Sequence, residues 1–318
     1  MKSIIFRVFS LIIVLSVLCS LLALSSCKNV DSGEDNILFT DALGREVSVK
    51  KNPSRVAALL GSFADVWTLS GGELCASSED GWDDFGLDLE GAVNIGGAHS
   101  PSLELLVSAD PELVIASAST ASNVDMREPL EAMGITVVYF DVKSFDDYLD
   151  MLNVCTDITG RKDLYEKNGL AVKEKIDLIK SRYAESDIPE EDRKILLLRV
   201  ASGFVKAKGS HGTVLGEMLC DIGCINIADS NRDLLENLSI EVIIRENPRH
   251  IFAVTMGNDT EAAQKSLEKL MKENSAWSTL DAVKSGRLHM MDKRLFNLKP
   301  NARWAESYEI LYDKLTKK

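Results

Sequence analysis

Two segments of the chain share one helix-turn-strand pattern, and this internal repeat restricts the fold more than any other feature. The segment SLELLVSADPELVIA covers residues 102–116, and SIEVIIRENPRHIFA covers residues 239–253, at a constant offset of 137 residues. The identical positions are Ser102 and Ser239, Glu104 and Glu241, Pro111 and Pro248, and Ala116 and Ala253. A chance match of two buried segments is the alternative, but the ungapped agreement favours a body with two similar halves.

Each repeated segment predicts a short helix followed by a buried strand. Ser102 is a suitable N-cap, because its hydroxyl can accept a hydrogen bond from the first helical turn. Asp110 and Pro111 end the helix, and the apolar residues 113–116 predict a buried strand. Strand and helix patterns of this kind alternate along the chain, after a predicted β-hairpin around Gly44. The alternation predicts an α/β fold with mostly parallel sheets.

The middle of the chain predicts a helical connection between two lobes. Residues 144–186 contain no strand signal, and apolar side chains recur there at helical spacing, at Tyr165, Val172, Ile176, Ile179 and Tyr183. A helix of ~20 residues spans ~30 Å, the width of a lobe. We therefore expect a Rossmann-like N-terminal lobe at 37–143, a single long backbone helix within 144–186, and a Rossmann-like C-terminal lobe at 187–318, with a ligand cleft between the lobes.

The beginning of the chain predicts export and attachment to a membrane. A short basic start precedes an apolar run over residues 8–24, and the run ends in LSSC, with Cys27 as the last residue. This pattern resembles the lipobox of bacterial lipoproteins, in which the signal is cut just before the cysteine and the thiol is lipidated. Residues 1–26 would then be the signal peptide, and 27–36 a lipidated polar tether. An uncleaved anchor helix is the alternative, since a span needs ~20 apolar residues.

The net charge argues against nucleic acid as a partner. The sequence has 36 basic and 49 acidic residues, a net charge of −13, and removal of the signal with Lys2 and Arg7 leaves −15. Such a chain repels phosphate and suits a soluble body held away from an anionic membrane surface. About 290 mature residues exceed the usual size of a single core, which again favours two lobes.

The cysteines predict neither a disulfide scaffold nor a metal site. Cys75, Cys155, Cys220 and Cys224 remain besides the anchor, and they are too few and too widely spread to form a small disulfide scaffold. Cys220 and Cys224 lie in CDIGC, where Gly223 is expected to end a helix. Buried thiols, or one disulfide, are therefore the expectation.

Three stretches make the sequence similar to a known family. They are TDALGREVSVKKNPSRVAAL, NIGGAHSPSLELLVSADPELVIA and WSTLDAVKSGRLHMMD. They resemble the substrate-binding lipoproteins of bacterial ABC importers, in the branch that handles iron-siderophores, haem and cobalamin, and the resemblance runs from about residue 37 to 315. It implies two lobes joined by one rigid helix, a ligand in the cleft, small closure of the lobes, and delivery to a permease dimer with its ATPase. We also expect a monomer.

The resemblance implies that Glu104 and Glu241 dock onto the permease. In the family, one surface glutamate of each lobe contacts arginines of the permease dimer, and these two residues occupy the matching positions. A twofold-symmetric permease presents the same basic patch twice, which suits one carboxylate from each half. The simpler alternative is that each glutamate only stabilises the positive end of its helix, by ~0.3–1 kcal/mol.

The cleft should be lined by loops that follow the carboxyl ends of strands. The candidate ligand-binding residues in these loops are Ser62, Phe63, Trp82, Ser117, Arg199, His211, Thr255, Met256, Arg294 and Phe296. Several have alternative roles. Arg199 lies in the apolar run ILLLRVA and must be paired or reach a cavity. Arg294 could simply be solvated, His211 could cap the following helix or coordinate haem iron, and Met256 could fill core space.

The residue types favour an iron-siderophore as the ligand. Arginines and aromatic faces suit an anionic iron chelate, whereas haem requires an axial ligand such as histidine, and the sequence has four histidines. Haem and cobalamin stay as alternatives, because the loop SEDGWDDFGLDLEG is acidic and would repel an anionic chelate. We expect no intrinsic cofactor or metal site.

No catalytic motif points to an enzyme. The sequence lacks a G-x-S-x-G elbow, a P-loop and a metal-binding histidine pair. Asp83 and Asp84 are adjacent carboxylates, but neighbours in sequence need not converge on one substrate. The remaining alternative to a carrier is a membrane-tethered sensor or metallochaperone with the same two lobes.

Overall fold

The computed structural model describes residues 35–257 and 259–317. The predicted signal peptide, Cys27 and most of the tether lie outside these residues. The strands are β1 (Asn36–Thr40), β2 (Glu46–Lys50), β3 (Val56–Ala58), β4 (Ala76–Ser77), β5 (Val93–Asn94), β6 (Leu113–Ser117), β7 (Thr136–Phe140), β8 (Lys194–Ala201), β9 (Phe204–Lys208), β10 (Ile225–Asn226), β11 (His250–Thr255) and β12 (Leu288–Met291).

Helices connect most of these strands. The α-helices are α2 (Gly61–Leu69), α3 (Asp80–Asp83), α4 (Leu103–Ser108), α5 (Ala121–Asp125), α6 (Arg127–Ala132), α7 (Phe145–Thr159), α8 (Lys162–Tyr165), α9 (Ala171–Ala184), α10 (Val214–Ile222), α11 (Arg232–Asn237), α12 (Ile240–Glu246), α13 (Thr260–Glu273), α14 (Asp281–Lys284), α15 (Lys293–Phe296) and α16 (Trp304–Thr316). A π-helix η1 (Glu166–Leu170) and the 3-10 helices η2 (Glu190–Arg193), η3 (Ser275–Thr279) and η4 (Asn301–Arg303) complete them.

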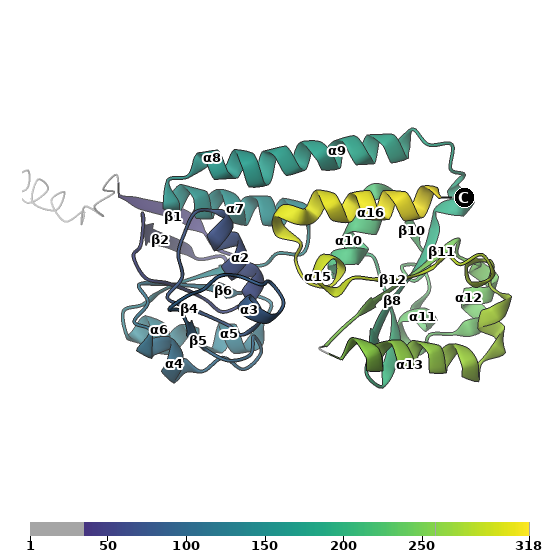
Figure 1. Ribbon diagram of the computed structural model, residues 1–318, viewed down its shortest axis with the longest axis horizontal. Helices are drawn as coiled ribbons and strands as arrows, with labels where there is room; N and C mark the ends of the chain where they lie inside the picture. The colour runs from purple at the N-terminus through teal and green to yellow at the C-terminus, as the bar shows by residue number, and fades with distance from the viewer. Residues whose placement is uncertain (1–34, 258, 318) are drawn as a thin grey trace, which may run out of the picture. The chain divides into compact units, whose positions relative to one another are not determined.

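Two five-stranded sheets form the centres of two lobes (Figure 1). The first sheet has the order β5-β4-β3-β6-β7, and all its pairs are parallel. The second has the order β10-β8-β11-β12 with parallel pairs, and β9 joins β8 in an antiparallel hairpin. The central strands β6 and β11 are buried at every position, as expected where helices cover both faces of a parallel sheet. The predicted fold class is confirmed.

The internal repeat is a structural repeat. The hydroxyl of Ser102 accepts a hydrogen bond from the backbone N–H of Leu105 at the start of α4, and Ser239 caps α12 in the same way. Asp110 and Asn247, which precede the two repeated prolines, both have a positive φ, at 49° and 40°. A short polar side chain tolerates this conformation better than an apolar one. The same cap and the same left-handed turn therefore lead into β6 in one lobe and into β11 in the other.

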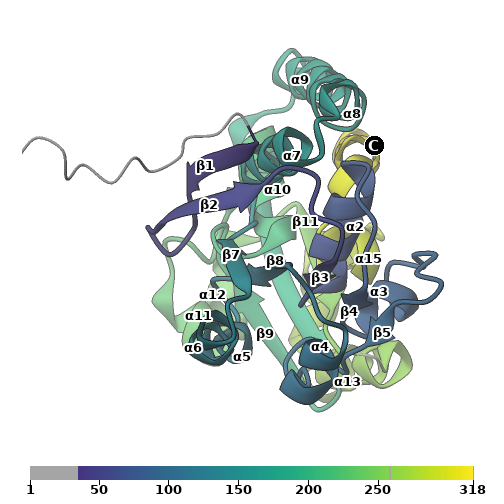
Figure 2. The same cartoon turned by 90° about the vertical axis from the view of Figure 1, so that its left-hand side faces the viewer.

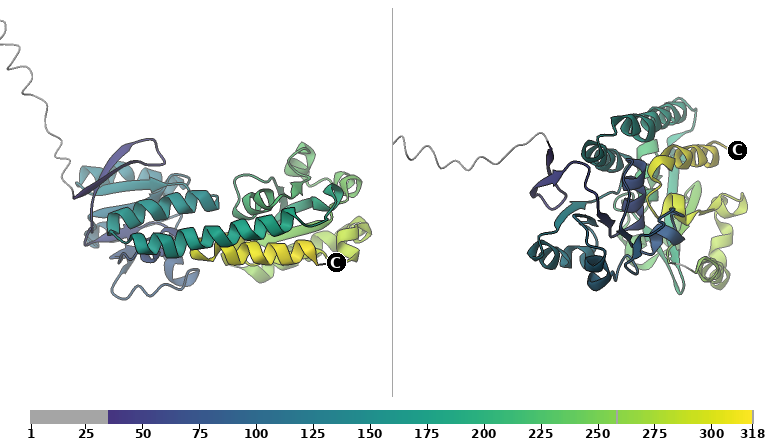
Figure 3. Two further views of the ribbon diagram at one scale, coloured as in Figure 1. Left: turned by 90° about the horizontal axis from the view of Figure 1, so that it is seen from above. Right: turned by 60° about the vertical axis from the view of Figure 1, so that its left-hand side comes forward.

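The connecting segment consists of two successive helices. The first, α7, has a capping box at Ser144 and Asp147 and ends at Gly160, whose φ of 69° closes the helix in the left-handed region. The second runs without a break over 162–184, through α8, η1 and α9, and it corresponds to the predicted backbone helix. It packs along α16, as the view from above shows (Figure 3).

One apolar core is shared by both lobes and the connecting helices. It includes Phe63 and Tyr148 from the first half, Ile179 from α9, and Leu215 and Trp304 from the second half. Two further cores cover the opposite faces of the sheets, one in each lobe. Since close-packed cores resist deformation, the shared core ties the lobes to the connecting helix.

Smaller elements agree with most sequence expectations. The strands β1 and β2 form a separate hairpin around Gly44 (Figure 2). Within the described residues, no helix is both long and apolar enough to span a membrane. All four described cysteines are free thiols, so the alternative of one disulfide is wrong, and Cys220 is exposed rather than buried.

Candidate functional site

The segment between β12 and α16 bridges the two lobes. Lys293 Nζ lies 2.8 Å from Asp84 Oδ1, and Arg294 Nη2 lies 3.1 Å from Asp65 Oδ2. The guanidinium of Arg294 also lies 3.9 Å from the ring centroid of Phe85. Each contact joins a residue of the N-terminal lobe to a residue more than 200 positions later in the chain. We call residues 293–301 the bridging segment.

Asn301 closes the far end of the bridging segment. This buried residue donates from Nδ2 to the carbonyl of Ser62 and to Asp65 Oδ2, both at 2.8 Å. Burial raises the pKa of Asp65, while the hydrogen bond from Asn301 and the charge of Arg294 act in the opposite direction. Burial likewise lowers the pKa of Arg294. The bridging contacts thus hold a desolvated ion pair at the junction of the lobes.

Several predicted ligand residues belong to this junction. Ser62, Phe63 and Phe296 are buried, and Arg294 is engaged by Asp65. Lys299 Nζ lies 6.0 Å from the ring centroid of Phe63, and its pKa is lowered by burial. The ring of Phe63 therefore packs in the shared core and also lies near the buried ammonium group of Lys299. Contact of these residues with a ligand stays a prediction.

The segment GSFAD is helical rather than a loop. Gly61 begins α2, and a β-carbon there would come within 2.5 Å of the backbone N of Gly81. The carboxylate of Asp80 accepts a hydrogen bond from the N–H of Gly61 at 2.9 Å. Ser62 and Phe63 follow in the first turn of α2, and both are buried. Trp82 lies in α3 and is partly buried.

Three cations gather on one face of the second sheet. Arg199 on β8 pairs directly with Lys206 on β9, and Leu197 pairs with Lys208. Alternate residues of a strand share a face, so the three side chains lie on the face opposite the core of Leu198 and Ala207. Arg199 lies toward the end of β8 at which the parallel strands finish, which is the edge where α/β sheets bind ligands. We call Arg199, Lys206 and Lys208 the basic cluster.

The basic cluster has no compensating acid. Within the described part of the chain, none of its three side chains forms an ion pair, and the buried Nε of Arg199 has no hydrogen-bond partner. Burial lowers the pKa of Arg199; burial and the charges of Arg199 and Lys206 lower that of Lys208. Lys206 is exposed, with its Nζ 5.7 Å from the ring centroid of Phe204, so the cost of desolvation falls mainly on Arg199. The arrangement is suited to bind an anion.

The ligand residues predicted from the sequence include Arg199 but not the two lysines. The run ILLLRVASGFVKAK contains a strand, a turn at Ser202 and Gly203, and a second strand in which two lysines alternate with apolar residues. Recognition of that hairpin would have placed both lysines beside Arg199.

The remaining predicted ligand residues have different environments. Ser117 and Thr255 are buried at the ends of β6 and β11, whereas Met256 is 43% exposed just beyond β11. The side chain of His211 is exposed, and its Nδ1 lies 3.1 Å from Glu217 Oε2. Thr213 rather than His211 caps α10, so the capping role considered for His211 is wrong. A role in ligand binding stays a prediction for all four.

Both repeated glutamates are exposed. Glu104 and Glu241 lie in the first turns of α4 and α12, and neither forms an ion pair among the described residues. Glu241 Oε2 accepts a hydrogen bond from the hydroxyl of Ser239 at 3.0 Å. A backbone hydrogen bond and this hydroxyl lower the pKa of Glu241, which keeps it ionised. The two acids are thus available to a cationic partner, although docking itself stays a prediction.

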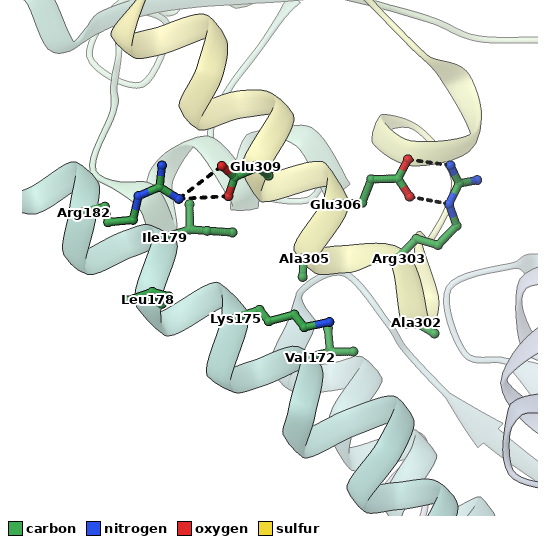
Figure 4. Close-up of a pocket in the computed structure, with 10 residues that line it drawn as sticks. All are labelled: Val172, Lys175, Leu178, Ile179, Arg182, Ala302, Arg303, Ala305, Glu306 and Glu309. Carbon is green, nitrogen blue, oxygen red and sulfur yellow. Dashed lines mark hydrogen bonds and ion pairs between the residues drawn. The ribbon is translucent and has the colours of Figure 1, made fainter.

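A groove between α9 and α16 is a weaker candidate for a ligand site. It has a volume of about 420 Å³, and its charges are mostly paired within it (Figure 4). Arg182 lies 3.1 Å from Glu309, and Arg303 lies 2.7 Å from Glu306. Paired charges offer little to an ionic ligand, so the basic cluster is the stronger site.

Comparison with known proteins assigns the family. The family model described as periplasmic binding protein matches residues 56–295, and the chain belongs to this family. The putative ABC transporter substrate-binding lipoprotein YhfQ of Bacillus subtilis (strain 168) is 22% identical over 314 residues, which cover 94% of this chain and 93% of the relative. The Fe(3+)-citrate-binding protein YfmC of the same organism is 23% identical over 281 residues, covering 85% and 84%.

A solved structure has the same fold. Staphylococcus aureus SirA complexed with staphyloferrin B superposes with a TM-score of 0.67 at 20% identity, covering 89% of this chain and 99% of that chain. The predicted family and its two-lobe α/β fold are confirmed. The family is one of binding proteins rather than of enzymes.

Proposed function

We propose that this protein is the extracytoplasmic substrate-binding component of an ABC importer and that its ligand is an anionic ferric chelate. Relatives described as an ABC transporter substrate-binding lipoprotein and as a Fe(3+)-citrate-binding protein support the class of protein and the class of ligand. The single observation that carries the choice of ligand is the basic cluster, whose three cations lack acidic partners among the described residues.

The acidic loop of the N-terminal lobe does not oppose this ligand as strongly as its sequence suggests. Asp84 is neutralised by Lys293, and Asp80 accepts the N–H of Gly61. Outside the loop, Asp65 is neutralised by Arg294. Charges that are paired at short range contribute little field at the position of a ligand. Four acids of the loop, Glu79, Asp83, Asp88 and Glu90, are exposed and form no ion pair among the described residues. The pairing of Asp84 thus reduces the repulsion of an anion without removing it, and the attraction comes from the basic cluster at the edge of the second sheet.

Glu104 and Glu241 are the proposed contacts with the permease. One exposed carboxylate in each half of a pseudo-symmetric body matches a twofold-symmetric partner that presents arginines. Charge-assisted hydrogen bonds to arginine are roughly twice as strong as neutral ones. The shared core and the bridging segment support delivery by a nearly rigid body, in which the lobes close only slightly.

Reconstitution with the importer tests this function. The mature protein loaded with a ferric chelate should stimulate ATP hydrolysis by the importer in liposomes, and the double change Glu104→Lys and Glu241→Lys should abolish the stimulation without altering chelate affinity. Stimulation that survives the double change would refute the docking role. Chelate binding without any stimulation by the unchanged protein would instead favour a tethered sensor.

We further propose that Cys27 carries the lipid anchor on the outer face of the cell membrane. The lipobox-like sequence and the relatives described as lipoproteins support this location. Labelling of growing cells with a tagged fatty acid should mark the protein, and Cys27→Ala should abolish the label; a label that persists in Cys27→Ala, or no label on the unchanged protein, would contradict lipid anchoring at Cys27. Residues 27–36 would act as a tether, with lobes at 37–143 and 187–318.

A further inference from the structure

A groove lies beside Glu241 in the C-terminal lobe. It has a volume of about 600 Å³ and is bordered by α11, the start of α12, the end of α13, and Trp277. Leu238, Ile240 and Leu270 supply its apolar surface, with Trp277 buried behind them. Cavities of ~300–1,000 Å³ are the size that receives ligands or side chains of a partner.

The charge of the groove has one sign. Asp233 and Glu241 are its ionisable lining residues, and no basic residue lines it. Neither carboxylate forms an ion pair among the residues that the structure describes. The hydroxyl of Ser239 donates to Glu241 and fixes that carboxylate at the rim. An apolar surface with two unpaired acids at its edge is complementary to a cation carried on an apolar segment.

The chain enters the two repeated helices differently in the two halves. Leu238 precedes the α12 cap with a φ of 49° and a ψ of 49°, a conformation that is strained for an apolar residue with a branched side chain. The residue at the same repeat position in the other half is Pro101, whose ring fixes a negative φ. The chain therefore approaches Glu104 and Glu241 along different paths, and α11 contributes to the groove on the C-terminal side.

We propose that this groove receives a basic side chain on an apolar loop of the permease, next to the contact made by Glu241. The inference rests on the proposed function, because it assumes that Glu241 faces the permease. The groove would then make the two docking contacts unequal, because Glu241 meets the permease through its charge and also through a side chain inserted beside it. Of the two lobes, the C-terminal one contributes more to the affinity for the permease.

Two changes test the groove without touching the chelate site. Asn237 is exposed and lines the groove, so Asn237→Trp should fill it. Asp233 is exposed and unpaired, so Asp233→Lys should repel a basic side chain. The matched control is Gln264→Trp, an equally exposed position on α13 that does not line the groove.

The measurement is the affinity of the full mature protein for the importer in lipid nanodiscs. We expect Asn237→Trp and Asp233→Lys each to weaken binding by at least about tenfold, the loss expected when one charge-assisted contact is removed. Gln264→Trp should stay within about twofold, and the affinity for ferric citrate should not change in any variant. Melting temperatures check folding, and Asp233→Lys decides the matter if Asn237→Trp is unstable.

The outcomes separate this inference from the function on which it rests. If Glu241→Lys weakens binding but neither groove variant does, the groove does not receive the permease. If Glu241→Lys also has no effect, the proposed docking surface is wrong. If the unchanged protein forms a dimer that Asn237→Trp dissociates, the groove binds a second copy and the proposal is overturned.

Discussion

Arg199 and Arg45 offer a matched test of paired against unpaired arginines. Both are partly buried, but their surroundings differ. Arg45 donates from Nε to Asp41 at 3.0 Å and from Nη2 to the carbonyl of Val137 at 2.9 Å, and Asp41 is buried. Arg199 lacks an acidic partner among the described residues, and its Nε is buried without a hydrogen bond.

The two substitutions to methionine should therefore change stability in opposite directions. Arg45→Met leaves the buried carboxylate of Asp41 without its ion-pair partner, and breaking such a buried pair costs about 3 kcal/mol of stability. Arg199→Met removes an unpaired, partly desolvated charge and should stabilise the protein by about 1 kcal/mol after allowance for solvent screening. At about 3 °C per kcal/mol, the melting temperature should fall by about 9 °C for Arg45→Met and rise by about 3 °C for Arg199→Met.

The same variant should lose ligand. Removal of a charge-assisted hydrogen bond costs about 1.5–3 kcal/mol, so Arg199→Met should bind a ferric carboxylate chelate about 10- to 150-fold more weakly. Calorimetric melting without ligand and titration with chelate measure the two effects separately. If Arg199→Met melts as far below the parent as Arg45→Met does, Arg199 has a structural role and the reasoning about the basic cluster fails.

Three further predictions concern the junction, the pH dependence and the motion of the lobes. Asn301→Ala should lower the unfolding free energy by about 2 kcal/mol, because the carbonyl of Ser62 and the carboxylate of Asp65 each lose a buried hydrogen bond and because alanine disfavours the φ of 55° at this position. Asn301→Gly loses the same hydrogen bonds but tolerates that φ, so its loss should be smaller. A loss under about 0.5 kcal/mol for Asn301→Ala in denaturant titrations would contradict this. In the folded protein, burial lowers the pKa of His250 to about 3 and of His289 to about 4, from an ordinary histidine pKa of 6.5. Below pH 6.5 the unfolded chain therefore binds more protons than the folded protein, and stability falls as the pH drops toward 4. His289→Phe should flatten that slope, and an unchanged slope would show that other groups control it. Small-angle scattering should show a contraction of under about 1 Å in radius of gyration on chelate binding, and a contraction of several ångströms would refute the rigid connection.

Local sequence determined the parts of the fold that could be predicted. The caps at Ser102 and Ser239 and the turns before Pro111 and Pro248 depend on residues within a few positions of one another, so the pattern was sufficient. The apolar spacing over 162–184 likewise predicted a helix whose buried side faces the core. The additional helix α7 was not separated from it, although the Gly160 stop signal was present.

Contacts between distant segments could not be predicted in the same way. Arg294 looked like a ligand residue because its polar loop follows a strand, and its partner Asp65 is 229 residues away in the other half. Phe63 and Phe296 were predicted beside the cleft from their loops, and the sequence did not show that both also pack in the shared core. Their environments depend on how the two halves meet, which no local pattern of residue types records.

Equilibrium titration of the purified mature protein with ferric citrate, ferric staphyloferrin B, haem and cobalamin tests the central claim most directly. The account predicts binding of a ferric carboxylate chelate with a dissociation constant below about 1 μM, weakened by high salt because the basic cluster supplies the attraction. Tighter binding of haem or cobalamin, or salt-independent binding of every compound, would contradict it.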